Sequence, residues 1–191
     1  MHSISTPLSE LAGQTADSIE PATRKAAESF ARLFTIVARL RAPDGCPWDR
    51  EQSIQSIRGN IVEEAYELVE AIGEGEREHI REESGDLFLL AAMTTYMCEQ
   101  EGSFSTAEAL DSVSEKLLRR HPHVFGDSVA DTPDAVVHQW NKIKEQKEGR
   151  RKKDSMLDEV PRHLPPLERA YKLQKKAAKA GFDWPDRKSV V

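Results

Sequence analysis

Apolar residues recur at intervals of three and four along most of this chain, the spacing that puts side chains on one face of a helix. No segment of useful length alternates apolar and polar residues as a half-buried strand does. The pattern therefore predicts an all-α protein built as a helical bundle. The expected helices cover about 22–41, a segment ending near 72, 77–100, 105–121, 132–147 and 166–180.

Prolines, glycines and polar clusters mark where these helices end. The loop APDGCPWD follows the first helix, and Asp49 or Ser53 is expected to cap the second. Gly73 and Gly75 break the pattern after it, and the segment HPHVFGD is expected to be irregular. These breaks predict a loose N-terminal arm over 1–22, one domain over 23–150, and a basic linker with a C-terminal helix over 151–191.

The most informative pattern is a pair of acidic motifs on two consecutive helices. Glu64 and Glu67 are three residues apart, and so are Glu83 and Asp86, so each pair lies on one helix face. In an antiparallel hairpin, residues at equal height are equidistant from the turn. Gly75 is the midpoint both of Glu67 and Glu83 and of Glu64 and Asp86. We therefore expect two levels of facing carboxylates near the turn.

A single pair of acidic residues on a helix is ordinarily explained as part of a solvated surface. The expected burial of Glu83 and Asp86 argues against that explanation here. After Leu87 the helix is apolar nearly all round, so it is expected to be central, with Glu83 and Asp86 turned toward an interior side. Carboxylates that face each other repel and resist desolvation. A hard divalent cation relieves both effects, and Mg²⁺ keeps waters that substrate phosphates can replace. The pattern predicts a magnesium site.

Cationic and aromatic residues could complete a nucleotide site. Lys116, Arg119 and Arg120 cluster at the end of the expected fourth helix, where they could hold phosphate oxygens or simply offset the helix dipole. Trp48, in a loop, and Trp140, on the fifth helix, could each stack on a base, with a core or lid role as the alternative.

Composition narrows the possible partners. The formal net charge of -6 argues against a general binder of duplex nucleic acid. The longest apolar run, 87–93, is too short to span a bilayer, and the N-terminus lacks the pattern of a signal peptide. We expect a cytoplasmic protein that has no membrane partner.

The acidic motifs and their surroundings resemble the MazG family of all-α nucleotide pyrophosphohydrolases. The family pattern E-x-x-E, a gap, then E-x-x-D is matched in full. The blocks CPWDREQ, EEAYE, EESGDL, KLLRRHPHVFGD and WNKIK are similar to MazG blocks in the same order, and so is the tail LPPLERAYKLQKKAAKAGFDWPD. The resemblance covers about residues 30–186.

This resemblance implies a four-helix core that forms a homodimer, with 23–150 as the catalytic domain. It implies hydrolysis of a nucleoside triphosphate, NTP or dNTP, between the α- and β-phosphates, with Mg²⁺ as cofactor and Mn²⁺ as a substitute. Glu63 would orient or deprotonate the attacking water. The other implied roles are metal binding by Glu64, Glu67, Glu83 and Asp86, phosphate binding by Lys116, Arg119 and Arg120, and nucleotide placement by Asn60, Trp140 and Trp48.

The chain is most similar to the first domain plus linker of two-domain MazG proteins. The alternative function is therefore a catalytically weak module for nucleotide binding or dimerisation. The complete acidic motif favours activity. A purely structural role would leave Glu83 and Asp86 on an apolar helix without explanation.

Overall fold

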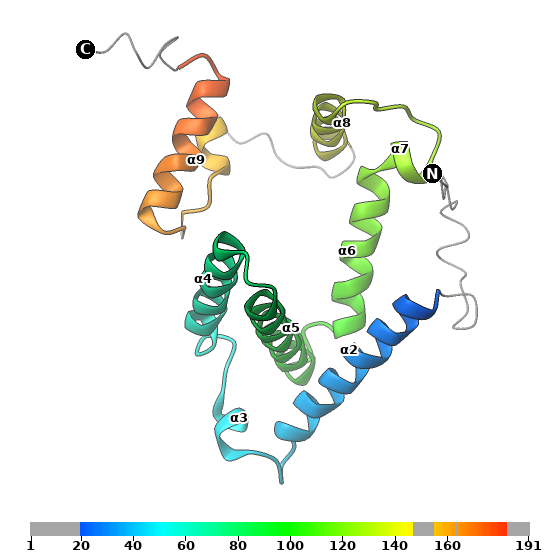
Figure 1. The fold of residues 1–191 in the computed structure, drawn as a ribbon, viewed down its shortest axis with the longest axis vertical. Coiled ribbons are helices and arrows are strands. Elements are labelled where there is room, and N and C mark those ends of the chain that lie inside the picture. The colour runs from blue at the N-terminus through cyan, green and yellow to red at the C-terminus, as the bar shows by residue number, and fades with distance from the viewer. Residues whose placement is uncertain (1–19, 147–154, 163, 183–191) are drawn as a thin grey trace. The chain divides into compact units, whose positions relative to one another are not determined.

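The structure is a computed structural model that describes residues 20–146, 155–162 and 164–182 (Figure 1). These residues form helices and no strand, which confirms the all-α prediction. The helices are α2 (Pro21–Leu40), α3 (Pro47–Glu51), α4 (Arg58–Glu74), α5 (Arg77–Gln100), α6 (Thr106–Arg120), α7 (Pro122–Phe125), α8 (Pro133–Gln146), η2 (Met156–Glu159) and α9 (Pro166–Lys179).

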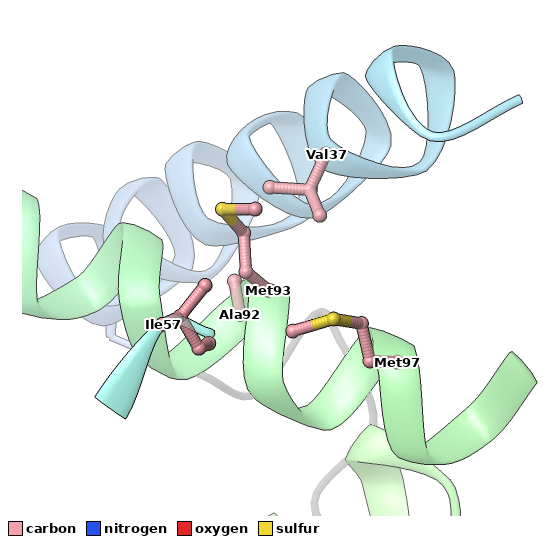
Figure 2. Packing of buried hydrophobic residues seen from close by; sticks show 5 residues of the cluster. All are labelled: Val37, Ile57, Ala92, Met93 and Met97. Atoms are coloured by element: carbon pink, nitrogen blue, oxygen red, sulfur yellow. The ribbon is translucent and has the colours of Figure 1, made fainter. Parts of the chain in front are cut away.

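Helix α5 is the centre of the fold, and α2, α4 and α6 each pack against it. Its apolar residues Ala92, Met93 and Met97 are buried against Val37 of α2 and Ile57, which precedes α4 (Figure 2). Burying one such large side chain contributes about 1.5–3 kcal/mol. The apolar surface predicted for residues 87–98 is thus the surface against which the other three helices pack.

A glycine turn sets the register between α4 and α5. Gly75 ends α4 in the left-handed conformation, with φ of 76°, and its N–H donates to the Ala71 carbonyl at 3.0 Å. Other residues lose roughly 1–2 kcal/mol in this conformation. The chain then reverses and α5 begins at Arg77, so the two acidic motifs lie on neighbouring antiparallel helices.

A capping box fixes the start of α6. The Ser105 hydroxyl accepts from the Glu108 N–H at 3.2 Å, and a Glu108 carboxylate oxygen accepts from the Ser105 N–H at 2.7 Å. The Thr106 hydroxyl then donates to Thr95 of α5 at 2.9 Å. These bonds attach the first turn of α6 to the end of α5.

Two segments differ from the sequence prediction. The second long helix begins at Arg58 and not at Asp49 or Ser53, because Pro47 starts the separate short helix α3 and Ser53 closes a turn with Ser56. The segment HPHVFGD, expected to be irregular, contains helix α7, since Pro122 supplies a favourable first helical residue.

The described chain divides into two compact units after Val129. The division falls in the irregular segment 126–132, and α8 lies in the second unit. Of the predicted arm, residues 1–19 lie outside the described residues, and Pro21 and Ala22 belong to α2. Residues 147–154, which include the start of the predicted linker, also lie outside them. Across the described residues, no helix combines the length and apolar character that a membrane span needs.

Candidate metal centre

Three carboxylates converge on the α4–α5 hairpin. Glu64 comes from α4, and Glu83 and Asp86 come from α5. One oxygen of each lies within 4.8 Å of the other two. Glu64 and Asp86 are half-buried, whereas Glu83 is buried with 5% of its surface exposed. The hairpin register predicted from the sequence thus places Glu64 beside Asp86 and brings Glu83 to the same cluster.

The two oxygens of Glu83 have different surroundings. Oε1 lies 3.2 Å from Nε2 of His79, one turn earlier on α5. Oε2 is buried and has no hydrogen-bond partner among the described residues. The neighbouring carboxylates cannot supply one, because an ionised carboxylate only accepts hydrogen bonds. A buried acceptor without a donor costs on the order of 1–3 kcal/mol, so Oε2 is positioned for a ligand.

The pKa shifts of Glu64 and Glu67 reflect desolvation and repulsion among these carboxylates. Partial burial, followed by the closeness of Glu83, raises the pKa of Glu64, and the charges of Glu67 and Asp86 raise it further. Desolvation and the charge of Glu83 also raise the pKa of Glu67. Each shift means that the folded protein disfavours the ionised form. A divalent cation would offset this repulsion, and oxygen donors alone suit a hard ion such as Mg²⁺. The residues present therefore fit the ion.

Glu67 stands at the edge of this cluster. It is exposed on α4 and is not one of the three residues whose oxygens meet within 4.8 Å. The charge of Glu83 nevertheless raises its pKa. Glu63, also exposed, lies one turn before Glu67, and its charge raises the pKa of Glu67 too. Asn60 is exposed one turn before Glu64. These residues extend the carboxylate face of α4 to solvent.

The predicted cationic cluster lies on another part of the first unit. Lys116, Arg119 and Arg120 occupy the last two turns of α6, while the hydrogen bonds between α6 and α5 involve Thr106 at its first residue. At a rise of 1.5 Å per residue, the cationic cluster lies about 15–21 Å beyond Thr106 along α6. Among the described residues, the groups that shift the pKa of Glu64 and Glu67 all belong to α4 and α5.

The two predicted tryptophans have different settings. Trp48 lies on α3 with 63% of its surface exposed. Arg41 supports this short helix by donating from Nη1 to the carbonyls of Asp49 and Gln52. Trp140 is half-buried on α8, in the second unit.

The sequence prediction missed His79. Its position one turn before Glu83 is a readable signal, because residues four apart meet on a helix face. Only the structure shows that this imidazole contacts a buried carboxylate.

Comparison with known proteins agrees with this geometry. Residues 52–125, which include all four predicted acidic ligands, match the MazG nucleotide pyrophosphohydrolase domain. The match begins just before α4 and ends with α7, so it contains the whole α4–α5 hairpin.

Longer relatives contain the same region. The nucleoside triphosphate pyrophosphohydrolase of Escherichia coli K12 is 42% identical over 161 residues, and the nucleoside triphosphate pyrophosphohydrolase/pyrophosphatase MazG of Thermotoga maritima is 40% identical over 161 residues. Each alignment covers 84% of this chain and 61% of the relative. The chain thus spans about three fifths of the length of these relatives.

A solved structure shares the fold. The crystal structure of a mazG-related protein from Thermotoga maritima matches with a TM-score of 0.54 and 24% sequence identity. The match covers 61% of this chain and 99% of that one. It supports the helical architecture.

Proposed function

We propose that this chain is a magnesium-dependent pyrophosphohydrolase that converts a nucleoside triphosphate and water into a nucleoside monophosphate and pyrophosphate. The observation that carries the proposal is the unpartnered, buried oxygen of Glu83 beside Glu64 and Asp86 within a MazG domain. The names of the longer relatives support the substrate class.

Glu64, Glu83 and Asp86 would hold the cation, and Glu67 would join them from the edge. A bound Mg²⁺ would polarise the phosphate oxygens and offset their charge. Glu63 is exposed beside this cluster, where it can accept a proton from an attacking water or orient it. Mn²⁺, which also accepts carboxylate oxygens, should substitute.

The other predicted residues would bind the nucleotide. Lys116, Arg119 and Arg120 would contact the phosphates, where guanidinium groups can bind oxygens in pairs. The exposed indole of Trp48 offers a stacking surface for a base. Asn60 would help to place the nucleoside, and the role of Trp140 stays a prediction from the sequence.

We also propose a homodimer, based on the outer face of α4. Val62, Tyr66 and Val69 form a stripe at intervals of four and three residues, and all three are exposed. The stripe lies on the side of α4 opposite the fully buried Ala71, so this helix is apolar on two faces. A second copy of the chain would cover the outer face and remove apolar surface from water.

The reaction is tested by incubating the chain with a panel of NTPs and dNTPs and Mg²⁺, and separating the products. Monophosphate and pyrophosphate in equal amounts are expected. Diphosphate and orthophosphate would place the attack at the γ-phosphate and refute the proposal. Nucleotide binding without any product would favour the alternative of a catalytically weak binding module.

A further inference from the structure

His79 contacts the most deeply buried carboxylate of the cluster, that of Glu83. Its Nε2 lies 3.2 Å from Oε1 of Glu83, and both residues are on α5. The imidazole is partly exposed, whereas the Glu83 side chain is buried. The contact therefore joins a solvent-facing ring to a carboxylate inside the fold.

We propose that His79 is a positioning residue that holds Glu83 in the orientation needed for the metal. Its Nε2–H would donate to Oε1, which lies 3.2 Å away, and this leaves Oε2 as the oxygen that faces the cation. Rotation of the carboxylate would exchange the two oxygens, and the hydrogen bond to His79 opposes that rotation. The inference rests on the proposed function, because it requires the acidic cluster to bind a divalent ion.

The structure distinguishes this role from an ordinary surface ion pair. Oε1 has the imidazole as a partner, whereas the buried Oε2 has none among the described residues. A contact that served stability alone would not require the second oxygen to stay without a donor. Hydrogen bonds that orient metal-binding carboxylates are typically worth 10–100-fold in metal affinity.

The same helix supplies a matched control. Glu78 forms an ion pair with Arg81, with 2.5 Å between Oε2 and Nη2, and both side chains are exposed. Like the His79–Glu83 pair, it joins neighbouring turns of α5, but it has no buried member. Exposed pairs of this kind contribute little to stability, because water and salt screen them.

The test measures binding of Mg²⁺ and Mn²⁺ alone, by titration calorimetry of the full chain without nucleotide. We expect His79→Ala to weaken binding by about 10–100-fold. His79→Gln can place an amide N–H at a similar distance and should restore most of the affinity. Glu78→Gln should bind as the wild type does. Thermal unfolding in EDTA should show that all three variants fold.

The outcomes separate the two proposals. If the wild type binds neither ion, the proposed function fails, and the role of His79 fails with it. If the wild type binds but His79→Ala binds equally well, only the role of His79 is refuted. If His79→Gln is as weak as His79→Ala, the hydrogen bond is not what positions Glu83. Recovery in His79→Gln together with unchanged Glu78→Gln would support the proposal.

Discussion

Replacing Glu83 with glutamine removes one negative charge from the acidic cluster while keeping the size of the side chain. Glu83 is the buried member of the three carboxylates, and its oxygen lies within 4.8 Å of oxygens from Glu64 and Asp86. The amide of Glu83→Gln can donate to these neighbours, whereas the carboxylate cannot. In the absence of metal, the variant should therefore be more stable than the wild type.

The geometry gives the size of this effect. Two unit charges 4.8 Å apart repel by about 1 kcal/mol in bulk water and about 3.5 kcal/mol at an effective dielectric constant of 20. Taking roughly 2 kcal/mol as the stability gain, the melting temperature should rise by about 4–8 °C for a chain of this size.

The stability gained from Mg²⁺ should be smaller in Glu83→Gln than in the wild type. In the wild type, a concentration 100-fold above Kd would add about 2.7 kcal/mol of stability. Glu83→Gln should lose most of this gain, and its pyrophosphate release should fall by at least about 100-fold. Thermal unfolding in EDTA and in Mg²⁺, together with a pyrophosphate assay, measures all three quantities.

Glu70→Gln is the matched control, because Glu70 is exposed on α4 and stands outside the acidic cluster. It should leave stability, the Mg²⁺ response and activity nearly unchanged. A Glu83→Gln variant that melts lower in EDTA and keeps the Mg²⁺ response would refute the metal-site reasoning. In the same assays, Glu67→Gln should reduce activity by about 100-fold if Glu67 joins the ion from the edge.

Three further predictions concern the cap of α6, pH and assembly. Ser105→Ala should cost about 1 kcal/mol in urea unfolding; no loss would mean that the capping box is dispensable. Hydrogen bonds from Ser105 lower the pKa of Glu108. Their stabilisation is therefore complete above the ordinary glutamate pKa and lost as pH falls through the lower folded value, a loss that Ser105→Ala should reduce. Burial and neighbouring carboxylates raise the pKa of Glu64. The metal-free wild type should therefore lose stability relative to Glu64→Gln as pH rises from the ordinary glutamate pKa through the raised folded value. A constant difference across the range would contradict this. Tyr66→Asp should convert a dimer to a monomer by light scattering at micromolar concentration, and an unchanged mass would show that the α4 stripe is not the interface.

The sequence by itself determined most of the long helices, and the hairpin that carries the acidic motifs. Apolar spacing predicted α5 over 77–100, and the structure has Arg77–Gln100. The position of Gly75 predicted the turn, since the left-handed conformation at a helix end favours glycine. These features depend on residues close together in the chain, so the register of Glu64 and Asp86 follows from local spacing alone.

Tertiary packing decided how the carboxylates differ from one another. The sequence predicted Glu83 and Asp86 on an interior side of their helix. In the structure Glu83 is buried, Glu64 and Asp86 are half-buried, and Glu67 remains exposed at the edge. Burial depends on which neighbouring helices cover each face, and α5 is covered by three of them. The same packing leaves Oε2 of Glu83 without a donor among the described residues.

The segments that the sequence placed wrongly have a related cause. Ser53 could cap a helix or close a turn, and the choice depends on Ser56 and on Ile57, which is buried in the core. Periodicity alone also cannot say whether a partner covers the exposed stripe of Val62, Tyr66 and Val69 on α4. Local hydrogen bonds and spacing fix where helices form, whereas burial is a property of the whole packed set.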